Sequence, residues 1–377
     1  MPKSHVLRFE AKQFQENILS WYAKNQRILP WRVKGRQKTD PYKVWLSEIM
    51  LQQTTVTAVI PYFLKFVERW PDVKSLAEAK DEHVMAAWAG LGYYARARNL
   101  LKCARVVQVK FKGKFPHCLD KLQSLPGIGP YTAAAILSIA FGKPATVVDG
   151  NIERIVSRLF AISTPLPLRK KEVLLKAQKI FENIDIFEKQ CVKSFPQALM
   201  DIGATICTPK NPSCNICPAQ NFCVASANNT AEFYPVKAVK KAIPIRIGKV
   251  YWIEDTAGKV IFEKRSDARM LGGMIGMPTT DWDLKEYENN DNEFVTLIEK
   301  KVKNLQNIGK IYHVFTHFRL ELNVMRGSVS DITRLTLGRK NMISLNIKDV
   351  KIENIGFPVV FLKAFNLINK TFLKVQN

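Results

Sequence analysis

This chain has 377 residues, of which 57 are lysine or arginine and 33 are aspartate or glutamate, giving a formal net charge of +24. No apolar run reaches the roughly 18 residues of a membrane-spanning helix, and the N-terminus lacks the apolar core of a signal peptide, so we expect a soluble, intracellular protein without membrane contact. The length allows two or three domains. The charge favours a polyanionic partner, although a lysine-rich genome or a need for solubility would produce the same excess.

The first 225 residues read as a succession of helices without a convincing β-strand. Apolar side chains at helical spacing predict the first helix within residues 13–26, and Asp40 can cap a second helix that starts at Pro41 and runs to Thr54. The same periodicity predicts further helices at 56–70, 75–91, 95–111, 151–160 and 170–181, and residues 194–207 lead into a cluster of cysteines. This half of the chain is therefore expected to be all-helical.

Glu48 is the exception in the helix that begins at Pro41. Val44 and Trp45 lie one turn before it and Leu51 one turn after it, so its carboxylate projects from a largely apolar face. Burial would raise the pKa of this carboxylate and keep a proton available near neutral pH, as a general acid requires. Taken alone, a glutamate on such a face is more often a structural residue bonded to a partner.

Residues 90–98 place glycines, paired aromatic residues and two arginines at the start of a helix. Tyr93 and Tyr94 precede Arg96 and Arg98 in this segment. Aromatic rings and guanidinium groups on a loop suit stacking against bases and contact with phosphates. Either tyrosine could instead be a core residue, Tyr94 more readily than Tyr93.

Residues 125–151 combine a tight turn with the start of a helix. Gly127 and Gly129 permit backbone geometry that side chains would block, so successive N–H groups can converge on one anion at the helix N-terminus. A phosphate is the natural anion, although a plain helix turn with two glycines would bind nothing. The sequence Val-Val-Asp-Gly-Asn then places Asp149 at the start of the next helix, where a capping role alone is worth about 1 kcal/mol.

Four of the seven cysteines share one short segment with the spacing C-x6-C-x2-C-x5-C, namely Cys207, Cys214, Cys217 and Cys223. An odd total in an intracellular chain argues against a disulfide framework, so this segment predicts a metal site. Structural zinc sites pair two C-x2-C knuckles, or one knuckle with two histidines, and only one knuckle is present. Four thiolates suit a [4Fe-4S] cluster equally well on chemical grounds, and the spacing favours the cluster.

The composition changes near residue 226. Residues 227–246 are polar, basic and proline-containing and read as a linker. Beyond them, residues 249–265 predict two strands around a turn, and residues 317–325 alternate between apolar and polar side chains. A mixed α/β domain is therefore expected at residues 247–377.

Five motifs in this order resemble the helix-hairpin-helix DNA glycosylases of the endonuclease III superfamily, and among them the adenine DNA glycosylases (the MutY family). They are VWLSEIMLQQT, GLGYYARARNL, LPGIGPYTA, VVDGN and the cysteine spacing, and the resemblance covers roughly residues 8–230. It implies a multidomain protein with an all-α core and a C-terminal α/β Nudix-like domain. Within the core, residues 29–142 would form a six-helix domain with the hairpin, and residues 1–28 and 143–226 the domain that holds a [4Fe-4S] cluster.

The same resemblance implies a monofunctional hydrolase of base excision repair, which removes adenine mispaired with 8-oxoguanine or guanine. Bifunctional relatives carry a Schiff-base lysine where this chain has Tyr131. By matching positions, Glu48 would protonate adenine and Asp149 would stabilise the oxocarbenium-like sugar, while Tyr131 and Asn151 would orient both groups. The implied partner is duplex DNA, bound by a monomer in the cytoplasm of a bacterium, at the nucleoid.

Further positions match DNA contacts of the family. Gly127 and Gly129 would bind a phosphate, and Gln53 and Tyr93 would wedge into the duplex beside the extruded base. Gln53 reads equally well as a solvated helix residue.

The C-terminal domain resembles the one in which adenine glycosylases use a Phe-Ser-His loop to read oxidised guanine. The corresponding loop here is Phe315-Thr316-His317, so Thr316 and His317 are the candidate readers. Threonine keeps the hydroxyl group but adds a methyl group, and Thr316 could also be an ordinary strand residue. Leu271 stands where many relatives have tryptophan. The glutamate-rich metal box of Nudix hydrolases is missing, so no pyrophosphate hydrolysis is expected.

Two other classes of protein fit part of the pattern. A glycosylase-lyase acting on oxidised pyrimidines would form a covalent DNA adduct that borohydride traps, and Tyr131 argues against it. A non-catalytic architectural DNA-binding protein would use the hairpin and the positive charge alone. That alternative leaves the buried carboxylate expected at Glu48 without an explanation.

Overall fold

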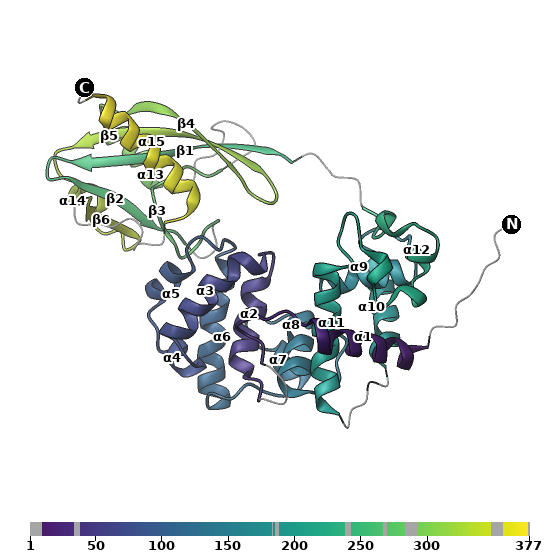
Figure 1. The fold of residues 1–377 in the computed structure, drawn as a ribbon. Helices are drawn as coiled ribbons and strands as arrows, with labels where there is room; N and C mark the ends of the chain where they lie inside the picture. Colours follow the sequence, from purple (N-terminus) through teal and green to yellow (C-terminus); the bar gives the residue numbers. More distant parts are fainter. Residues whose placement is uncertain are drawn as a thin grey trace. The chain divides into compact units, whose positions relative to one another are not determined.

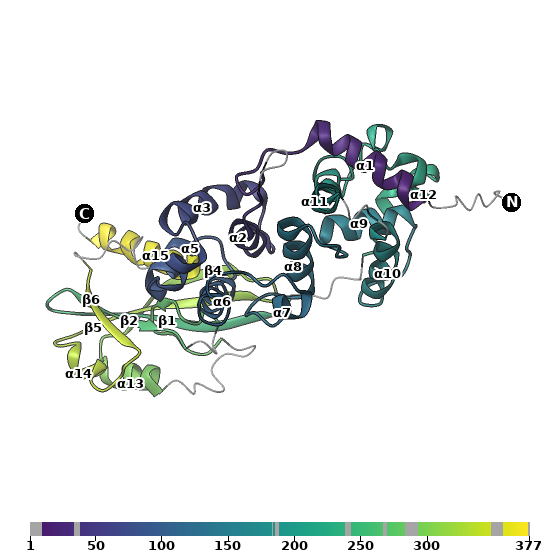
Figure 2. The same cartoon turned by 90° about the horizontal axis from the view of Figure 1, so that it is seen from below.

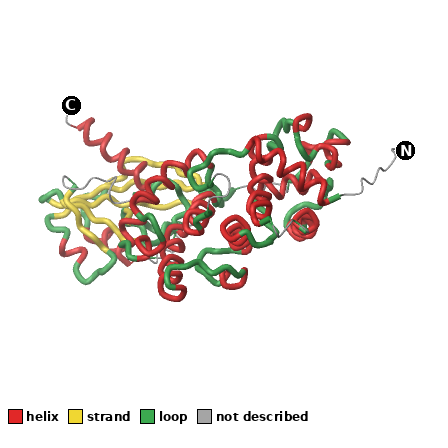
Figure 3. Tube along the Cα trace, turned by 60° about the horizontal axis from the view of Figure 1, so that its bottom comes forward, coloured by secondary structure: helices red, strands yellow, loops and turns green. Residues whose placement is uncertain are grey.

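The computed structural model of this chain describes residues 10–33, 38–182, 184, 188–237, 243–266, 270–282, 293–347 and 357–375. The chain divides into two compact units, one formed by Met1–Glu78 with Lys102–Lys240 and the other by Ala79–Leu101 with Lys241–Asn377. Among the described residues every strand belongs to the second unit and none precedes Ile245 (Figures 1 and 3). The all-helical character of the first 225 residues is confirmed for this part of the chain, whereas the domain boundaries at residues 28, 142 and 246 remain predictions.

Five helices of the first unit pack around one another (Figures 1 and 2). They are α1 (Ala11–Asn25), α9 (Gly150–Leu159), α10 (Arg169–Phe181), α11 (Lys189–Thr205) and α12 (Val224–Ala227). Their shared interior is aromatic, because Phe195 of α11 meets Phe14 of α1 edge-on at 6.3 Å between ring centroids and Phe181 of α10 at 5.1 Å. Phe14 and Ile18 are fully buried, so the spacing that predicted the first helix also marks its buried face.

The helix α2 (Pro41–Leu51) begins as predicted and ends early. The Asp40 carboxylate accepts a hydrogen bond from the Tyr42 N–H at 2.9 Å, and Pro41 fills the first helical position. The helix ends at Leu51 rather than at residue 54, because Gln52 leaves the helical region with ψ = 111° and Gln53 follows with the left-handed backbone angle φ = 57°. Gln53 is therefore an exposed residue beyond the helix and not a helix residue.

The single helix predicted at residues 75–91 is in fact two, α4 (Val73–Ala77) and α5 (Asp81–Trp88). Asp72 and Ser75 form a reciprocal cap that starts α4, and the extended backbone of Lys80 starts α5. The other helical elements are α3 (Val56–Arg69), α6 (Ala95–Phe111), α7 (Leu119–Gln123), α8 (Pro130–Ala135), the π-helical turn η1 (Ile136–Ala140) and the 3-10 turns η2 (Cys214–Ile216), η3 (Gln220–Phe222) and η4 (Ala231–Phe233). In the described part of the chain, no helix is long and apolar enough to cross a lipid bilayer.

One six-stranded mixed sheet forms the centre of the second unit. Its strand order is β3-β2-β1-β5-β4, with β6 paired to β2. The long strands β1 (Ile245–Asp255) and β5 (Arg319–Val329) are parallel, and the other pairs are antiparallel. The shorter strands are β2 (Lys259–Lys264), β3 (Ile275–Gly276), β4 (Gln306–Val314) and β6 (Met342–Asn346). The strands predicted at residues 249–265 and 317–325 are confirmed as β1, β2 and β5.

Helices cover both faces of this sheet. Val250 and Trp252 of β1 face a core shared with α15 (Val359–Val375), which packs against β4 (Figure 1). Their neighbours Tyr251 and Ile253 face the opposite core, shared with α13 (Glu293–Lys301) and α14 (Thr333–Thr336). Since successive strand residues point to opposite faces, a strand covered on both sides is apolar at consecutive positions. The expected mixed α/β domain is confirmed.

The first part of the segment predicted as a linker, residues 227–246, is bonded to the first unit. At its start the Tyr234 carbonyl accepts a hydrogen bond from Arg158 Nε at 3.1 Å, and the Val236 carbonyl accepts one from Arg169. These bonds attach the segment to α9 and α10 of the first unit. Residues 238–242 lie outside the described residues, and β1 begins at Ile245.

Candidate active site

Glu48 is buried in the first unit, with 7% of its surface exposed. Its Oε2 atom accepts a hydrogen bond of 2.7 Å from the Tyr131 hydroxyl, which α8 supplies. Burial raises the pKa of Glu48 to about 7; the Tyr131 hydrogen bond opposes this rise, the charge of Asp149 adds to it, and the charge of Arg32 lowers it. At neutral pH a substantial fraction of Glu48 is therefore protonated.

Tyr131 acts as a donor at neutral pH. Burial raises the pKa of its phenol well above the usual value, and the charges of Glu48 and Asp149 raise it further. The phenol therefore keeps its proton and can hold the Glu48 carboxyl in a fixed orientation.

Asp149 caps α9, as the sequence predicts. Its carboxylate accepts hydrogen bonds from the Ile152 N–H at 2.7 Å and from Asn151 Nδ2 at 2.8 Å. Burial raises the pKa of Asp149, whereas these two hydrogen bonds and the charge of Arg154 oppose the rise. Asp149 thus receives more donors than Glu48 does, which makes it the easier of the two carboxyl groups to ionise.

Arg154 connects Asn151 to the cysteine segment, a link that sequence reasoning missed. Its Nη2 atom donates to Asn151 Oδ1 at 2.9 Å and to the Gly203 carbonyl at 2.6 Å, and its Nε atom donates to the Cys207 carbonyl at 2.7 Å. A Cβ atom at Gly203 would lie 2.5 Å from the Asn151 Cβ, so only glycine lets α11 approach α9 this closely. The only sign of this close packing in the sequence is Gly203 itself, a glycine within a segment of otherwise helical pattern.

Asp201 of α11 is fully buried and holds two arginines that precede α2. Arg27 donates to it through Nε at 2.5 Å and through its backbone N–H at 3.0 Å. Arg32 donates through both terminal nitrogens, at 2.7 and 3.0 Å. Because Arg32 also acts on the charge of Glu48, this buried cluster sets part of the electrostatics of the candidate site.

A pocket of about 280 Å³ opens beside Arg32 in the first unit. Its wall includes aromatic rings and an amide from elements far apart in the sequence, among them Tyr22, Trp31 and Gln197. Apolar and aromatic side chains combined with a few polar groups are typical of pockets that bind small molecules.

The two hairpin glycines differ in their geometry. Gly127 has φ = 76°, which favours glycine, whereas Gly129 has φ = −85°, which any residue adopts. The expectation that both need glycine for conformational reasons is therefore wrong for Gly129. A Cβ atom at Gly129 would meet nothing within 4 Å, so its missing side chain leaves open space before the N-terminus of α8.

Gln53 and Tyr93 share an uncommon backbone conformation. Gln53 has φ = 57° and Tyr93 has φ = 47°, both in the left-handed region that non-glycine residues rarely adopt. Tyr93 has 44% of its surface exposed, while Tyr94 is buried with 7% exposed. Residues held in such strained backbone conformations cluster at functional sites. Tyr94 is the core residue of the pair.

Thr316 and His317 are exposed in the turn between β4 and β5, so Thr316 is not a strand residue. The Thr316 hydroxyl forms a hydrogen bond of 2.7 Å with the Tyr93 hydroxyl, within the second unit. In the same unit, Arg98 donates to the carbonyl of Gly272, next to Leu271. The second unit therefore joins two residues that sequence reasoning assigned to DNA contact on separate grounds.

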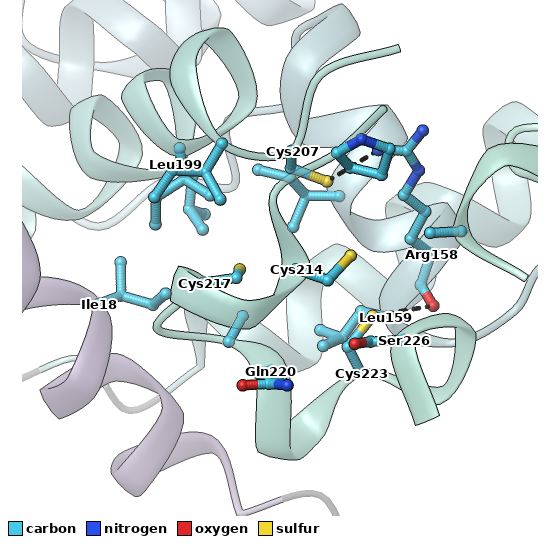
Figure 4. Close-up of a pocket in the computed structure, with 16 residues that line it drawn as sticks. Ile18, Arg158, Leu159, Leu199, Cys207, Cys214, Cys217, Gln220, Cys223 and Ser226 are labelled. Carbon is cyan, nitrogen blue, oxygen red and sulfur yellow. Dashed lines mark hydrogen bonds between the residues drawn. The ribbon is translucent and has the colours of Figure 1, made fainter. Parts of the chain in front are cut away.

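The four clustered cysteines line one pocket in the first unit (Figure 4). Buried Arg158 donates from Nη1 to Cys207 Sγ at 3.2 Å, and to the Thr208 carbonyl at 2.8 Å. Burial raises the pKa of Cys217 to about 12 and that of Cys223 to about 11. Among the described residues, no group of three or more histidine, cysteine or acidic side chains is arranged to hold a single metal ion.

Known families match both halves of the chain. The family model described as "HhH-GPD superfamily base excision DNA repair protein" matches residues 46–183, and the one described as "NUDIX domain" matches residues 249–367. The fold class expected from the sequence, a helix-hairpin-helix core followed by a Nudix-like domain, is confirmed by these matches.

Curated relatives match along most of the chain. "Adenine DNA glycosylase" of Buchnera aphidicola subsp. Acyrthosiphon pisum is 36% identical over 348 residues, covering 92% of this chain and 94% of the relative. "Adenine DNA glycosylase" of Homo sapiens is 30% identical over 369 residues, covering 84% of this chain and 67% of the relative. Among solved structures, a thermostable thymine-DNA glycosylase is 28% identical with a TM-score of 0.49, covering 58% of this chain and 97% of that one.

Proposed function

Because this chain belongs to the adenine DNA glycosylases, enzymes of base excision repair, we propose that it hydrolyses the N-glycosidic bond of adenine paired with 8-oxoguanine or guanine. The observation that carries the proposal is the buried carboxyl of Glu48, whose pKa is raised to about 7 and which Tyr131 holds at 2.7 Å. A group that is protonated near neutral pH and fixed in orientation suits proton donation to a leaving base.

The reaction requires two carboxyl groups in different protonation states. Glu48 donates its proton to N7 of the extruded adenine, the bond between C1′ and N9 breaks, and the bonding electrons leave with the base. Ionised Asp149 stabilises the positive charge left on the sugar until water adds to C1′ and gives up its proton to the Glu48 carboxylate, which restores the acid. Asn151 and Tyr131 are positioning residues, because each is hydrogen-bonded to one of these carboxyl groups.

The same geometry favours a monofunctional enzyme. A lyase needs an amine that forms a Schiff base with C1′, and the position of that lysine in bifunctional relatives carries the phenol of Tyr131. A phenol has no nitrogen and cannot form a Schiff base. The product is therefore an abasic site in an intact strand.

The pocket beside Arg32 is the proposed receptacle for the extruded adenine. Tyr22, Trp31 and Gln197 line it, and Arg32, whose charge acts on Glu48, borders it. The Gln197 amide keeps one N–H and its carbonyl for the edge of the base, because its other N–H donates to the Lys193 carbonyl. The open space before α8 leaves room for a phosphate of the flipped strand, and exposed Gln53 can fill the vacated stack.

Recognition of 8-oxoguanine is proposed for Thr316, His317 and Tyr93. Thr316 and His317 occupy an exposed turn, and the hydrogen bond between Thr316 and Tyr93 brings the three side chains to one place in the second unit. The threonine hydroxyl can donate to and accept from an edge of the oxidised base, as a serine would.

The cysteine segment fits a [4Fe-4S] cluster by the chemistry of its donors. Four thiols face a common pocket, and the guanidinium of Arg158 beside Cys207 would offset the negative charge of a thiolate-ligated cluster (Figure 4). Cys207, Cys214, Cys217 and Cys223 would be its ligands. When bound, such a cluster supplies a rigid cross-link of the segment.

The proposed activity predicts base removal without strand cleavage. In single-turnover reactions on a duplex with adenine opposite 8-oxoguanine, strand breaks are expected only after alkaline treatment, because hydrolysis leaves an alkali-labile abasic site. Borohydride should trap no protein on the DNA. A duplex with cytosine opposite 8-oxoguanine is the matched control and should stay intact. Breaks without alkali would assign a lyase, and no product from adenine would redirect the search to pyrimidine lesions.

A pH dependence follows from the raised pKa of Glu48. The acid is protonated below its pKa of about 7 and loses its proton above it, so the single-turnover rate should fall about tenfold per pH unit above that value. Since the charges of Glu48 and Asp149 interact, the measured midpoint belongs to the pair. A rate profile between pH 5.5 and 9 tests this expectation. A rate that stays level up to pH 9 contradicts the assignment of Glu48 as the acid.

Cys214→Ser should lose the visible absorbance and most of the iron, about four atoms per chain in the wild type, because a cluster needs all four thiolates. DNA affinity should fall as the segment loses its cross-link. Cys118→Ser is the matched control, because Cys118 is exposed and outside the segment, and it should keep both the absorbance and the affinity. An unchanged spectrum in Cys214→Ser would remove the metal assignment.

A further inference from the structure

Trp282 lies against the turn that carries Thr316 and His317. Its ring is stacked on the ring of Phe315, with 5.7 Å between centroids and 30° between planes, and it contacts Phe318 at 6.5 Å. Phe315 and Phe318 flank Thr316 and His317 in the sequence, and their ring centroids lie 4.8 Å apart. Both ends of the turn therefore rest on the same buried ring, which has 7% of its surface exposed.

The turn itself is short and closed. The Phe315 N–H donates to the Phe318 carbonyl at 2.9 Å, so the four residues form a tight loop. Phe318 is buried and Phe315 half-buried, whereas Thr316 and His317 are exposed. Thr316 is bonded to the Tyr93 hydroxyl, and its backbone is supported by the two aromatic residues that flank the turn.

The Trp282 ring is held firmly from other sides. The guanidinium of Arg265 lies 5.1 Å from the ring centroid, and it is fixed by bonds of 3.0 Å to Thr279 Oγ1 and 2.9 Å to the Met270 carbonyl. On β1, a Cβ atom at Gly248 would come within 2.9 Å of Trp282 Cδ1. The ring therefore packs directly on the backbone of the central sheet, which gives the turn a rigid support.

We propose that Trp282 is a positioning residue for recognition of the base opposite adenine, acting through Phe315 on Thr316. The inference rests on the proposed reading of 8-oxoguanine by this turn. Precise placement of a hydroxyl group requires that its supporting shell be fixed, because a side chain displaced by about 1 Å loses its hydrogen bond to the ligand. Removing the ring frees the turn without altering either reader.

The test compares single-turnover excision of adenine opposite 8-oxoguanine with excision opposite guanine. Trp282→Leu and Phe315→Leu should each lower the ratio of the two rates by about tenfold, and Trp282→Phe should restore it because a ring is retained. Excision opposite guanine should stay within twofold of wild type. The variant with both leucines should match each single variant, because the two residues act in one chain of contacts.

Trp252→Leu is the matched control, since Trp252 is buried in the same core with 2% of its surface exposed and its ring packs on Phe262 and Phe365. It should lower the melting temperature and leave the ratio unchanged. Two results would overturn the proposal and assign Trp282 a general structural role. One is a double variant whose loss of the rate ratio is the product of the two single losses, and the other is an equal fall of the rate ratio in Trp252→Leu. A comparison of wild type with Thr316→Ala tests the proposed function separately. Wild type should excise adenine faster opposite 8-oxoguanine than opposite guanine, and Thr316→Ala should lose this preference; if it does not, the turn does not read 8-oxoguanine.

Discussion

Glu48→Gln is expected to lower the single-turnover rate of adenine excision by about 10³-fold while leaving the affinity for duplex DNA unchanged. Glutamine has the same shape, and its carbonyl can still accept the 2.7 Å hydrogen bond from Tyr131, so the local structure should persist. The amide cannot transfer a proton to the base. The measurement is a rate under enzyme excess, together with binding to a duplex that carries a non-cleavable adenine analogue.

The stability of Glu48→Gln provides an independent check. The folded protein holds the Glu48 proton more tightly than the unfolded chain does. This tighter proton binding contributes folding stability that is fully present below the unfolded pKa and is lost as the pH rises through about 7. Glutamine never ionises, and the variant should be at least as stable as wild type at pH 8. Glu172→Gln is the control variant. Glu172 lies on α10 and accepts a hydrogen bond from Thr164, so this variant makes the same chemical change outside the candidate site and should keep the wild-type excision rate. If Glu48→Gln retains a tenth of the rate or more, another group donates the proton.

Asp149→Asn should lower the excision rate by about 10²-fold to 10³-fold, because it removes the negative charge that faces the developing positive sugar. Asparagine caps a helix about as well as aspartate does, so α9 should still begin at Gly150. The new NH2 group takes the place of Oδ2 and cannot accept the hydrogen bond from Asn151 Nδ2, so the side chain at position 149 is also held less firmly in place. The measurement is again the single-turnover rate, with thermal melting in parallel.

A matched control separates catalysis from capping at Asp149. Asp72 caps α4 through a 2.8 Å bond from the Ser75 N–H, outside the candidate site. Asp72→Asn makes the same chemical change at a helix cap and should leave the excision rate unchanged. A variant Asp149→Asn that lowers only the melting temperature, with a normal rate, would reduce Asp149 to a structural cap.

Local patterns in the sequence predicted most of the fold. The apolar spacing of Phe14 and Ile18 and the cap at Asp40 depend on neighbours within one helical turn, so they could be read without the tertiary structure. The alternation at Phe318, Leu320 and Leu322 predicted a strand in the same way, and all three side chains are buried. The break between α4 and α5 was missed, because both segments continue one apolar pattern.

The candidate site was predicted only as far as its residues belong to recognisable motifs. Glu48, Tyr131 and Asp149 could be named because each stands in a short segment with a family pattern. Their contacts could not be derived, since Glu48 and Tyr131 are 83 positions apart and meet only when α2 packs on α8.

Several features were decided by the tertiary structure alone. Arg154 bonds the carbonyl of Cys207, 53 positions away, and also bonds Asn151. Gly203 is required because a side chain there would collide with Asn151. Trp282 supports the turn at Phe315 from a distant part of the chain. Hydrophobic periodicity and capping act over a few residues and are written in the local sequence, whereas the direction of a buried side chain depends on which distant segments pack beside it. The sequence by itself therefore determined the class of fold and the family of residues at the site, and the packing decided how those residues meet.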